Sequence, residues 1–190
     1  MKFISFLLNK EAKFGIINNK SITDLTGKIS SANTLKTLIE NKGISKAIKY
    51  VTKNPGNISL DDIEYLPLIP DPGKIICVGL NYSEHVKETN RTVEENPVVF
   101  HRFPESQTAH LQAIQRPITS HSLDYEGEMA VIMGEGGKHI KPEDALKHIV
   151  GYSCYNESTI REWQRHTSQF GMGKNFENTG SFGPHMVLAE

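Results

Sequence analysis

Hydrophobic and polar positions change their spacing several times along the chain, and each change predicts a different element. The opening stretch "FISFLLNKEAKFGIINNKSITDL" consists of short apolar runs separated by polar residues. This pattern is typical of short strands joined by turns, and Asn18-Asn19 suits the tip of one turn. Leucine and isoleucine then recur at helical spacing in "NTLKTLIENKG", with Asn33 or Thr34 as the cap and Gly43 as the end. "GISKAIKYV" predicts a second, weaker helix.

A proline-rich stretch interrupts this pattern. "YLPLIPDPGK", residues 65–74, contains three prolines and one glycine. Proline resists both helices and central strands, so we expect an extended linker here. We place a domain boundary near Pro70. The predicted division is a small N-terminal domain at 1–65, a linker at 66–73 and a larger domain at 74–190.

The larger part contains more strand patterns than helix patterns. "KIICVGL" is apolar throughout and predicts a strand buried on both faces, while "NPVVFHRF", "LDYEGEMAVIMG" and "VGYSCYN" predict three further strands. "SEHVKE" reads as a helical turn, and "KPEDALKHI" as a helix with Pro142 in its first turn. "STIREWQRHTSQF" predicts another helix, with Thr159 and Glu162 as a capping box. The fold class is therefore α+β and rich in β-structure, with a curled or barrel-like sheet.

Composition narrows the functional classes. The chain has 190 residues, 37% of them hydrophobic, and a net charge of -1. This charge gives no broad affinity for nucleic acid or an anionic membrane. No apolar run approaches the ~18 residues of a membrane span, and the start lacks a signal-peptide pattern, so we expect a cytoplasmic protein. Cys77 and Cys154 lie in apolar sequence, which predicts buried reduced thiols, with a disulfide as the alternative.

The stretch "DYEGEMAVIMG" places carboxylates at Asp124, Glu126 and Glu128. Residues two apart in a strand share a face and lie ~6.6 Å apart, so Glu126 and Glu128 can reach one ion. Oxygen ligands favour Mg²⁺, Mn²⁺ or Ca²⁺ over Zn²⁺, and such an ion would offset the repulsion between the carboxylates. The alternative is a solvated strand face. The apolar "AVIMG" that follows indicates that the acidic end lies at the mouth of a core.

Four motifs occur in series, and together they resemble the fumarylacetoacetate hydrolase (FAH) family. These are "GKIICVGLNYSEHVKE", "DYEGEMAVIMG", "GYSCYNESTIREWQ" and "GKNFENTGSFGP". The likeness runs from about Leu66 to the end, and residues 1–65 resemble the small N-terminal domain of many bacterial members. It implies a mixed-sheet roll of the FAH type and a homodimer.

The resemblance also implies a metal site. Glu126 and Glu128 match the family's Glu-x-Glu pair, and Glu157 matches a third acidic ligand that is usually aspartate. Glutamate is one methylene longer, so Mg²⁺ should tolerate the change less well than Mn²⁺ or Ca²⁺. Arg102 is a second departure, because many members have lysine there.

Substrate-binding and catalytic residues follow from the same resemblance. Arg161 and Gln164 match the family's Arg-x-x-Gln, which holds substrate oxygens, and Lys174 matches a lysine near the metal. His85 and Glu88 match a pair that activates water in hydrolytic members. The alternative for His85 and Glu88 is an incidental ion pair on a surface helix.

These residues imply a metal-dependent enzyme acting on a 2-oxo acid or 1,3-dicarbonyl. A water activated by His85 would give hydrolytic C–C cleavage of the acylpyruvate or fumarylacetoacetate type. One alternative is an isomerase or decarboxylase of aromatic catabolism on the same scaffold. A second is a non-catalytic or inactive fragment, since family members continue beyond the final "GPHMVLAE". The expected partner is a small-molecule substrate, and neither nucleic acid nor a membrane is expected.

Overall fold

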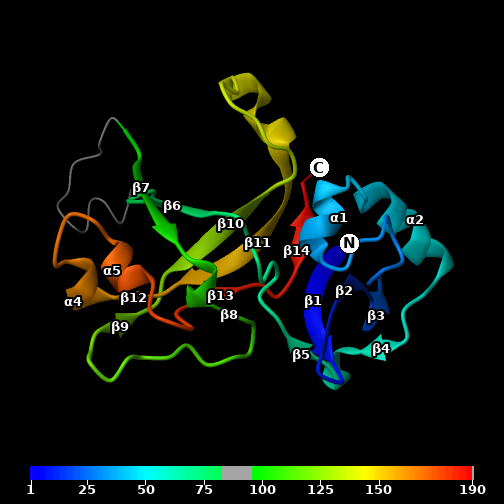
Figure 1. The fold of residues 1–190 in the computed structure, drawn as a ribbon, viewed down its shortest axis with the longest axis horizontal. Helices are drawn as coiled ribbons and strands as arrows, with labels where there is room; N and C mark the ends of the chain where they lie inside the picture. The colour runs from blue at the N-terminus through cyan, green and yellow to red at the C-terminus, as the bar shows by residue number, and fades with distance from the viewer. Residues whose placement is uncertain (83–95, 190) are drawn as a thin grey trace.

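A curled mixed sheet organises the chain (Figure 1). The computed structural model describes residues 1–82 and 96–189. Ten strands in this part form one sheet, with the path β4-β3-β2-β1-β14-β11-β13-β8 and with β10 and β5 attached to β11 and β1. Two smaller sheets, β12-β9 and β6-β7, lie beside it. Helices are few and short, so the predicted β-rich α+β roll is confirmed.

The N-terminal part builds one end of the sheet from local signals. Its elements are β1 (Lys2–Leu8), β2 (Glu11–Asn18), β3 (Ser21–Asp24), α1 (Leu35–Glu40), α2 (Ile44–Lys53), β4 (Ile58–Ser59), a 3₁₀ turn (Leu60–Asp62) and β5 (Glu64–Tyr65). Asn9 and Asn19 have positive φ angles of 53° and 58°, which asparagine tolerates in tight turns between strands. Thr34 caps α1 by accepting a hydrogen bond from the backbone N–H of Thr37 at 3.1 Å. The predicted strands, turn and first helix are confirmed.

The C-terminal part completes the sheet. Its strands are β6 (Ile75–Gly79), β7 (Val98–Arg102), β8 (Gln107–Thr108), β9 (Leu123–Asp124), β10 (Gly127–Met133), β11 (Ile149–Glu157), β12 (Thr159–Ile160), β13 (Gly180–Phe182) and β14 (Met186–Leu188). Its helices are α4 (Arg161–Gln164) and α5 (Gly171–Lys174), with 3₁₀ segments at Pro104–Ser106 and Pro142–His148.

The two parts share one sheet and one core. Strand β14 pairs with β1 on one side and β11 on the other, so the first and last strands are neighbours (Figure 1). Phe3 and Phe14 from the N-terminal part pack in the same buried cluster as Tyr155, Phe182 and Met186. The division into domains at 1–65 and 74–190 stays a prediction, but any such domains meet through a continuous core.

Strand β6 corrects the prediction of a strand buried on both faces. Ile76 is 57% exposed and Val78 is 48% exposed. The reason is topological, because β6 pairs with β7 in a two-stranded sheet outside the main one. Strand β10 behaves similarly. Ile132 is buried, whereas Val131 and Met133 on the opposite face are exposed.

The helix expected from Ser158 onward is also shorter than predicted. Thr159 belongs to β12 and pairs with Asp124 of β9, so it does not cap the helix. The Ser122 hydroxyl instead accepts the Glu162 N–H at 3.2 Å. The helix predicted around Pro142 is a 3₁₀ segment rather than an α-helix.

Both cysteines are free thiols, as predicted, but Cys154 is exposed and Cys77 is only partly buried. It lies on β11 opposite Met129, on the outward face of that pair. No helix within residues 1–82 or 96–189 has the length and apolar character of a membrane span.

The proline-rich stretch is extended but firmly anchored. Leu68 is fully buried, and its carbonyl accepts a hydrogen bond from the Ser5 hydroxyl at 2.7 Å. The Leu68 N–H donates to the carbonyl of Phe182 at 3.2 Å. This stretch therefore packs between β1 and β13 and is not an exposed linker.

We expect Leu68→Ala to lower the free energy of unfolding by about 2–5 kcal/mol, because it leaves a cavity in a closed core. Leu146→Ala, at an exposed leucine, should change it by less than about 0.5 kcal/mol. Urea unfolding of both variants checks this expectation. Equal midpoints for the two variants would show that the stretch around Leu68 contributes no packing.

Candidate active site

The pairing of β10 with β11 places the acidic motif in the site. Gly127 pairs with Asn156 and Glu128 with Tyr155, and the Glu157 N–H donates to the Glu126 carbonyl at 2.8 Å. The Asn156 side chain accepts the Glu126 N–H at 3.1 Å. This pairing places the Glu126 and Glu157 carboxyl groups next to each other, although they are 31 residues apart in sequence.

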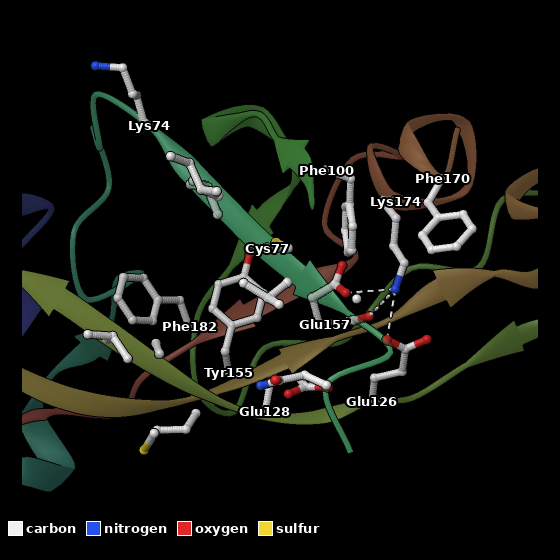
Figure 2. A pocket seen from close by; sticks show the side chains of 18 of the residues that line it. Lys74, Cys77, Phe100, Glu126, Glu128, Tyr155, Glu157, Phe170, Lys174 and Phe182 are labelled. Atoms are coloured by element: carbon white, nitrogen blue, oxygen red, sulfur yellow. Dashed lines mark hydrogen bonds and ion pairs between the residues drawn. The ribbon is translucent and has the colours of Figure 1, made fainter. Parts of the chain in front are cut away.

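Lys174 lies between these two carboxylates (Figure 2). Its ammonium group donates to Glu126 Oε2 at 2.8 Å and to Glu157 Oε2 at 2.7 Å. It also donates to the Glu157 carbonyl at 3.3 Å and lies 5.2 Å from the centre of the Phe100 ring. The Lys174 side chain is only 1% exposed, so these contacts replace its hydration.

Arg161 holds the outer carboxylates. Its guanidinium lies 2.7 Å from Glu126 Oε1 and 2.7 Å from Asp124 Oδ2. It also donates to Gln164 Oε1 at 3.0 Å, one turn along α4. The predicted neighbouring positions of Arg161 and Gln164 are therefore confirmed, although the helix that carries them is a single short segment.

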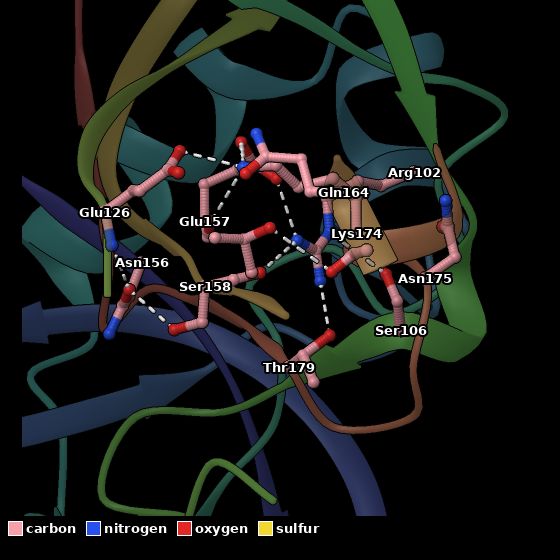
Figure 3. A network of polar contacts seen from close by, with 12 residues as sticks. Arg102, Ser106, Glu126, Asn156, Glu157, Ser158, Gln164, Lys174, Asn175 and Thr179 are labelled. Carbon is pink, nitrogen blue, oxygen red and sulfur yellow. Dashed lines mark hydrogen bonds and ion pairs between the residues drawn. The ribbon is translucent and has the colours of Figure 1, made fainter. Parts of the chain in front are cut away.

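Arg102 anchors the innermost carboxylate (Figure 3). Its guanidinium donates to Glu157 Oε1 at 2.8 Å and to the Ser158 carbonyl at 3.0 Å. Further donors reach the Ser106 hydroxyl at 3.2 Å and the Thr179 hydroxyl at 2.8 Å. Arg102 and Glu157, which the sequence resemblance marked as departures, are thus direct partners.

Burial changes the acid–base properties of several groups here. It raises the pKa of the Glu157 carboxyl, while the charges of Lys174 and Arg102 act in the opposite direction. Burial raises the pKa of the Cys77 thiol and of the Tyr155 hydroxyl to about 12 each. The negative charge of Glu128 raises the pKa of the Tyr82 hydroxyl. Cys77 and Tyr155 therefore keep their protons at neutral pH.

A cleft of about 1630 Å³ opens over these groups. It is lined by the carboxylates, by Arg161, Gln164 and Lys174, and by apolar side chains of β6 and β10. Of the residues predicted from the sequence, the structure brings together Glu126, Glu157, Arg161, Gln164 and Lys174, and Glu128 lines the same cleft. His85 and Glu88 lie outside the described residues.

Basic side chains counter the crowding of the carboxylates. Arg161 and Lys174 pair with the acidic motif, and Arg102 pairs with Glu157. The metal ion expected from the sequence stays a prediction, whereas the alternative of a solvated strand face is wrong for Glu126, whose carboxylate is mostly buried and ion-paired. The anchoring role of Arg102 was missed, because nothing in the sequence shows which of the distant acids it contacts.

The donor set fits a hard cation in its chemistry. Glu126 and Glu157 converge on one cationic nitrogen through carboxylate oxygens alone, the ligand type that Mg²⁺, Mn²⁺ and Ca²⁺ prefer. Within the described residues, no group of three or more His, Cys, Asp or Glu side chains is drawn together as a metal cage. Lys174 is the cation that Glu126 and Glu157 hold in this arrangement.

Comparison with known proteins identifies the family. The family model of the fumarylacetoacetate (FAA) hydrolase C-terminal region matches residues 74–190, and the chain therefore belongs to this family. A fumarylacetoacetate hydrolase domain-containing protein 2 homologue of Dictyostelium discoideum is 29% identical over 99% of this chain and 65% of its own length. The mitochondrial oxaloacetate tautomerase fahd2 of Xenopus laevis is 37% identical over 70% of this chain and 42% of its own length.

Solved structures show the same fold. The fumarylacetoacetate hydrolase of Exiguobacterium antarcticum superimposes with a TM-score of 0.77 at 30% identity, covering 99% of this chain and 66% of its own. A maleylpyruvate hydrolase of Sphingobium, solved with manganese(II) and pyruvate, has a TM-score of 0.79 at 19% identity over 67% of its length. This chain thus spans about two thirds or less of these relatives.

We expect Arg102→Met to lower the free energy of unfolding by about 3–5 kcal/mol, because it leaves the Glu157 carboxylate buried with only one cation. Arg165→Met, at an exposed arginine, is the matched control. In denaturant unfolding, the double variant Arg102→Met/Glu157→Gln should lose much less unfolding free energy than the single variant Arg102→Met. Strictly additive losses in the double variant would mean that the two side chains are not energetically coupled.

Proposed function

We propose that this chain binds a divalent cation in the cleft and promotes proton transfer within a 2-oxo acid, as in keto–enol tautomerisation. The observation that supports this proposal is the group of carboxylates at one end of the cleft. Asp124, Glu126, Glu128 and Glu157 lie there with Arg102, Arg161 and Lys174, so this local group has one more acid than bases when all are ionised. One divalent cation would make the local charge positive and would favour an anionic substrate.

Glu126, Glu128 and Glu157 are the residues that would hold the ion. All three line the cleft, and Glu126 and Glu157 already converge on a cationic group. When bound, a divalent ion supplies a template and a Lewis acid for a 2-oxo carboxylate. The distant maleylpyruvate hydrolase, which was solved in complex with manganese(II) and pyruvate, supports this assignment.

The basic side chains would then act on the substrate. The Arg161 guanidinium and the Gln164 amide lie together at the rim, where they can bind substrate oxygens. The Lys174 ammonium lies deeper and can stabilise the oxyanion that develops as a carbon-bound proton leaves. Its hydrogen bonds to Glu126 and Glu157 give it two carboxylates with which to exchange a proton.

Sequence similarity supports tautomerisation as the first candidate. The oxaloacetate tautomerases of Xenopus laevis and Rattus norvegicus are each 37% identical over 70% of this chain, and the fumarylacetoacetate hydrolase of Exiguobacterium antarcticum is 30% identical over 99% of it. The base proposed to activate water, His85, lies outside the described residues. Hydrolytic C–C cleavage that uses His85 and Glu88 is the second candidate, and a homodimer remains a prediction.

For the ion, we expect Glu126→Gln and Glu128→Gln each to weaken Mn²⁺ binding by at least about 10-fold, since each removes one charged oxygen ligand. Glu143→Gln, on the exposed 3₁₀ segment, is the control. Titration calorimetry of the three variants measures this directly. Unchanged Mn²⁺ affinity in both cleft variants would overturn the proposed ion site.

For the reaction, we expect Arg161→Met and Lys174→Met to lower kcat/KM for oxaloacetate enol–keto conversion by about 10²–10³. The loss of enol absorbance follows this conversion, and acetylpyruvate cleavage is measured on the same samples. Lys147→Met, at an exposed lysine, should have no effect. Acetylpyruvate cleavage without oxaloacetate conversion would assign the hydrolytic alternative, and an absence of both activities would overturn both candidates.

A further inference from the structure

Asp124, the first carboxylate of the acidic motif, lines the cleft but has no task in the proposed ion site or the proposed chemistry. Its side chain lies against Arg161, which is proposed to bind substrate oxygens. Arg161 Nε donates to Asp124 Oδ2 at 2.8 Å, and Nη2 lies 2.7 Å from the same oxygen. One carboxylate oxygen thus holds the Nε–Nη2 edge of the guanidinium.

The backbone fixes both partners of this contact. Asp124 of β9 pairs with Thr159 of β12, which is fully buried, and Arg161 follows two positions later. The Arg161 N–H donates to the Ser122 carbonyl at 3.0 Å, and the Ser122 hydroxyl accepts the Glu162 N–H at 3.2 Å. Strands β9 and β12 and the start of α4 therefore form one unit, which keeps the two side chains beside each other (Figure 1).

The other side of the guanidinium contacts groups that have a second role. Nη1 donates to Glu126 Oε1 at 2.7 Å and to Gln164 Oε1 at 3.0 Å, which uses both of its hydrogen atoms. Glu126 also accepts from Lys174 and belongs to the proposed ion site, and Gln164 is proposed to bind substrate. Because Asp124 has neither task, its contact with Arg161 can stay intact when the cleft is occupied.

These contacts leave one guanidinium nitrogen for a substrate. Nη2 carries two hydrogen atoms, and Asp124 Oδ2 takes only the one on the side of Nε. The second hydrogen points away from Asp124, and the Arg161 side chain is 22% exposed and lines the cleft, so a ligand can reach it. Holding a long arginine side chain in place before the ligand arrives removes an entropic cost from binding.

The exposure of the pair separates positioning from stabilisation. The Asp124 side chain is 46% exposed, about twice as much as that of Arg161. An ion pair in contact with water adds little to the stability of a fold, because water screens the charges and both side chains lose freedom. The contribution of Asp124 should therefore be seen in turnover and not in the unfolding temperature.

We propose that Asp124 is a positioning residue, which orients the Arg161 guanidinium so that Nη2 meets the substrate. This inference rests on the proposed function, in which Arg161 binds oxygens of a 2-oxo acid. Asp124→Ala removes the acceptor, and kcat/KM for oxaloacetate enol–keto conversion should fall about 10-fold, because the guanidinium is no longer held in one orientation. Asp124→Asn keeps an acceptor oxygen at the same place, so its loss should not exceed about 3-fold.

A double-variant cycle with the full chain and Mn²⁺ tests this inference. The loss of enol absorbance gives the rates of Asp124→Ala, Arg161→Met and the double variant. If Asp124 acts through Arg161, Asp124→Ala should change the rate of the Arg161→Met variant by less than about 2-fold. Thermal unfolding should show that Asp124→Ala lowers Tm by less than about 2 °C. The control is Asp144→Ala, because Asp144 is 42% exposed and pairs with Lys147 at 2.6 Å outside the cleft; it should change neither quantity.

Three results would overturn the positioning role and leave the proposed function standing. These are unchanged turnover in Asp124→Ala while Arg161→Met lowers the rate, an equal loss from Asp124→Ala with and without Arg161, and a loss accompanied by a markedly lower Tm. An Asp124→Asn variant as slow as Asp124→Ala would assign the effect to charge alone and would also reject positioning. If Arg161→Met leaves the rate unchanged, the proposed role of Arg161 and this inference are both overturned.

Discussion

The buried carboxylate of Glu157 is the group on which the rest of the site depends. An ionised carboxylate removed from water costs several kcal/mol unless it is paired and hydrogen-bonded. Here Arg102 and Lys174 each hold one of its oxygens, at 2.8 and 2.7 Å (Figure 3). These partners come from β7 and α5, so the charge on β11 can be buried only when three separate segments assemble around it.

The same pairing prepares the cleft for chemistry. Because Glu157 fixes Lys174, the ammonium also reaches Glu126, and Arg161 then joins Glu126 to Asp124. The charged groups thereby support one another in a chain of contacts, and each limits the freedom of the next. Groups held in this way need little reorganisation free energy when a substrate charge develops, which is the condition for electrostatic catalysis.

Local signals explain which features could be predicted from the sequence. The turn at Asn19 and the cap at Thr34 depend on neighbouring residues alone, and both were predicted. The failures involve distant pairing. Thr159 has the sequence of a helix cap, but it pairs with Asp124 in a small sheet, and the apolar β6 reads as a central strand although its place outside the main sheet leaves one face exposed.

In the site too, contacts between distant residues could not be predicted from the sequence. Motif resemblance found Glu126, Glu157, Arg161 and Lys174, because these residues lie in short recognisable stretches. It marked Arg102 only as a departure, since its ion pair with Glu157 spans 55 residues and exists only in the folded chain. No sequence pattern marks the unpartnered atoms of Tyr155 and Gln107, because being unpartnered is a property of the surrounding space.

The polar groups of the cleft therefore form two sets, charged groups that have partners and neutral groups that do not. In the charged half, each oxygen of Glu126 and Glu157 has a cation beside it. In the neutral half, a phenol and an amide oxygen remain unpartnered among the described residues. This difference follows from desolvation, because an unpaired buried charge costs far more free energy than an unpaired neutral dipole. The fold therefore supplies a cation to each carboxylate oxygen of Glu126 and Glu157, whereas it can leave a neutral oxygen unpartnered at a much lower cost.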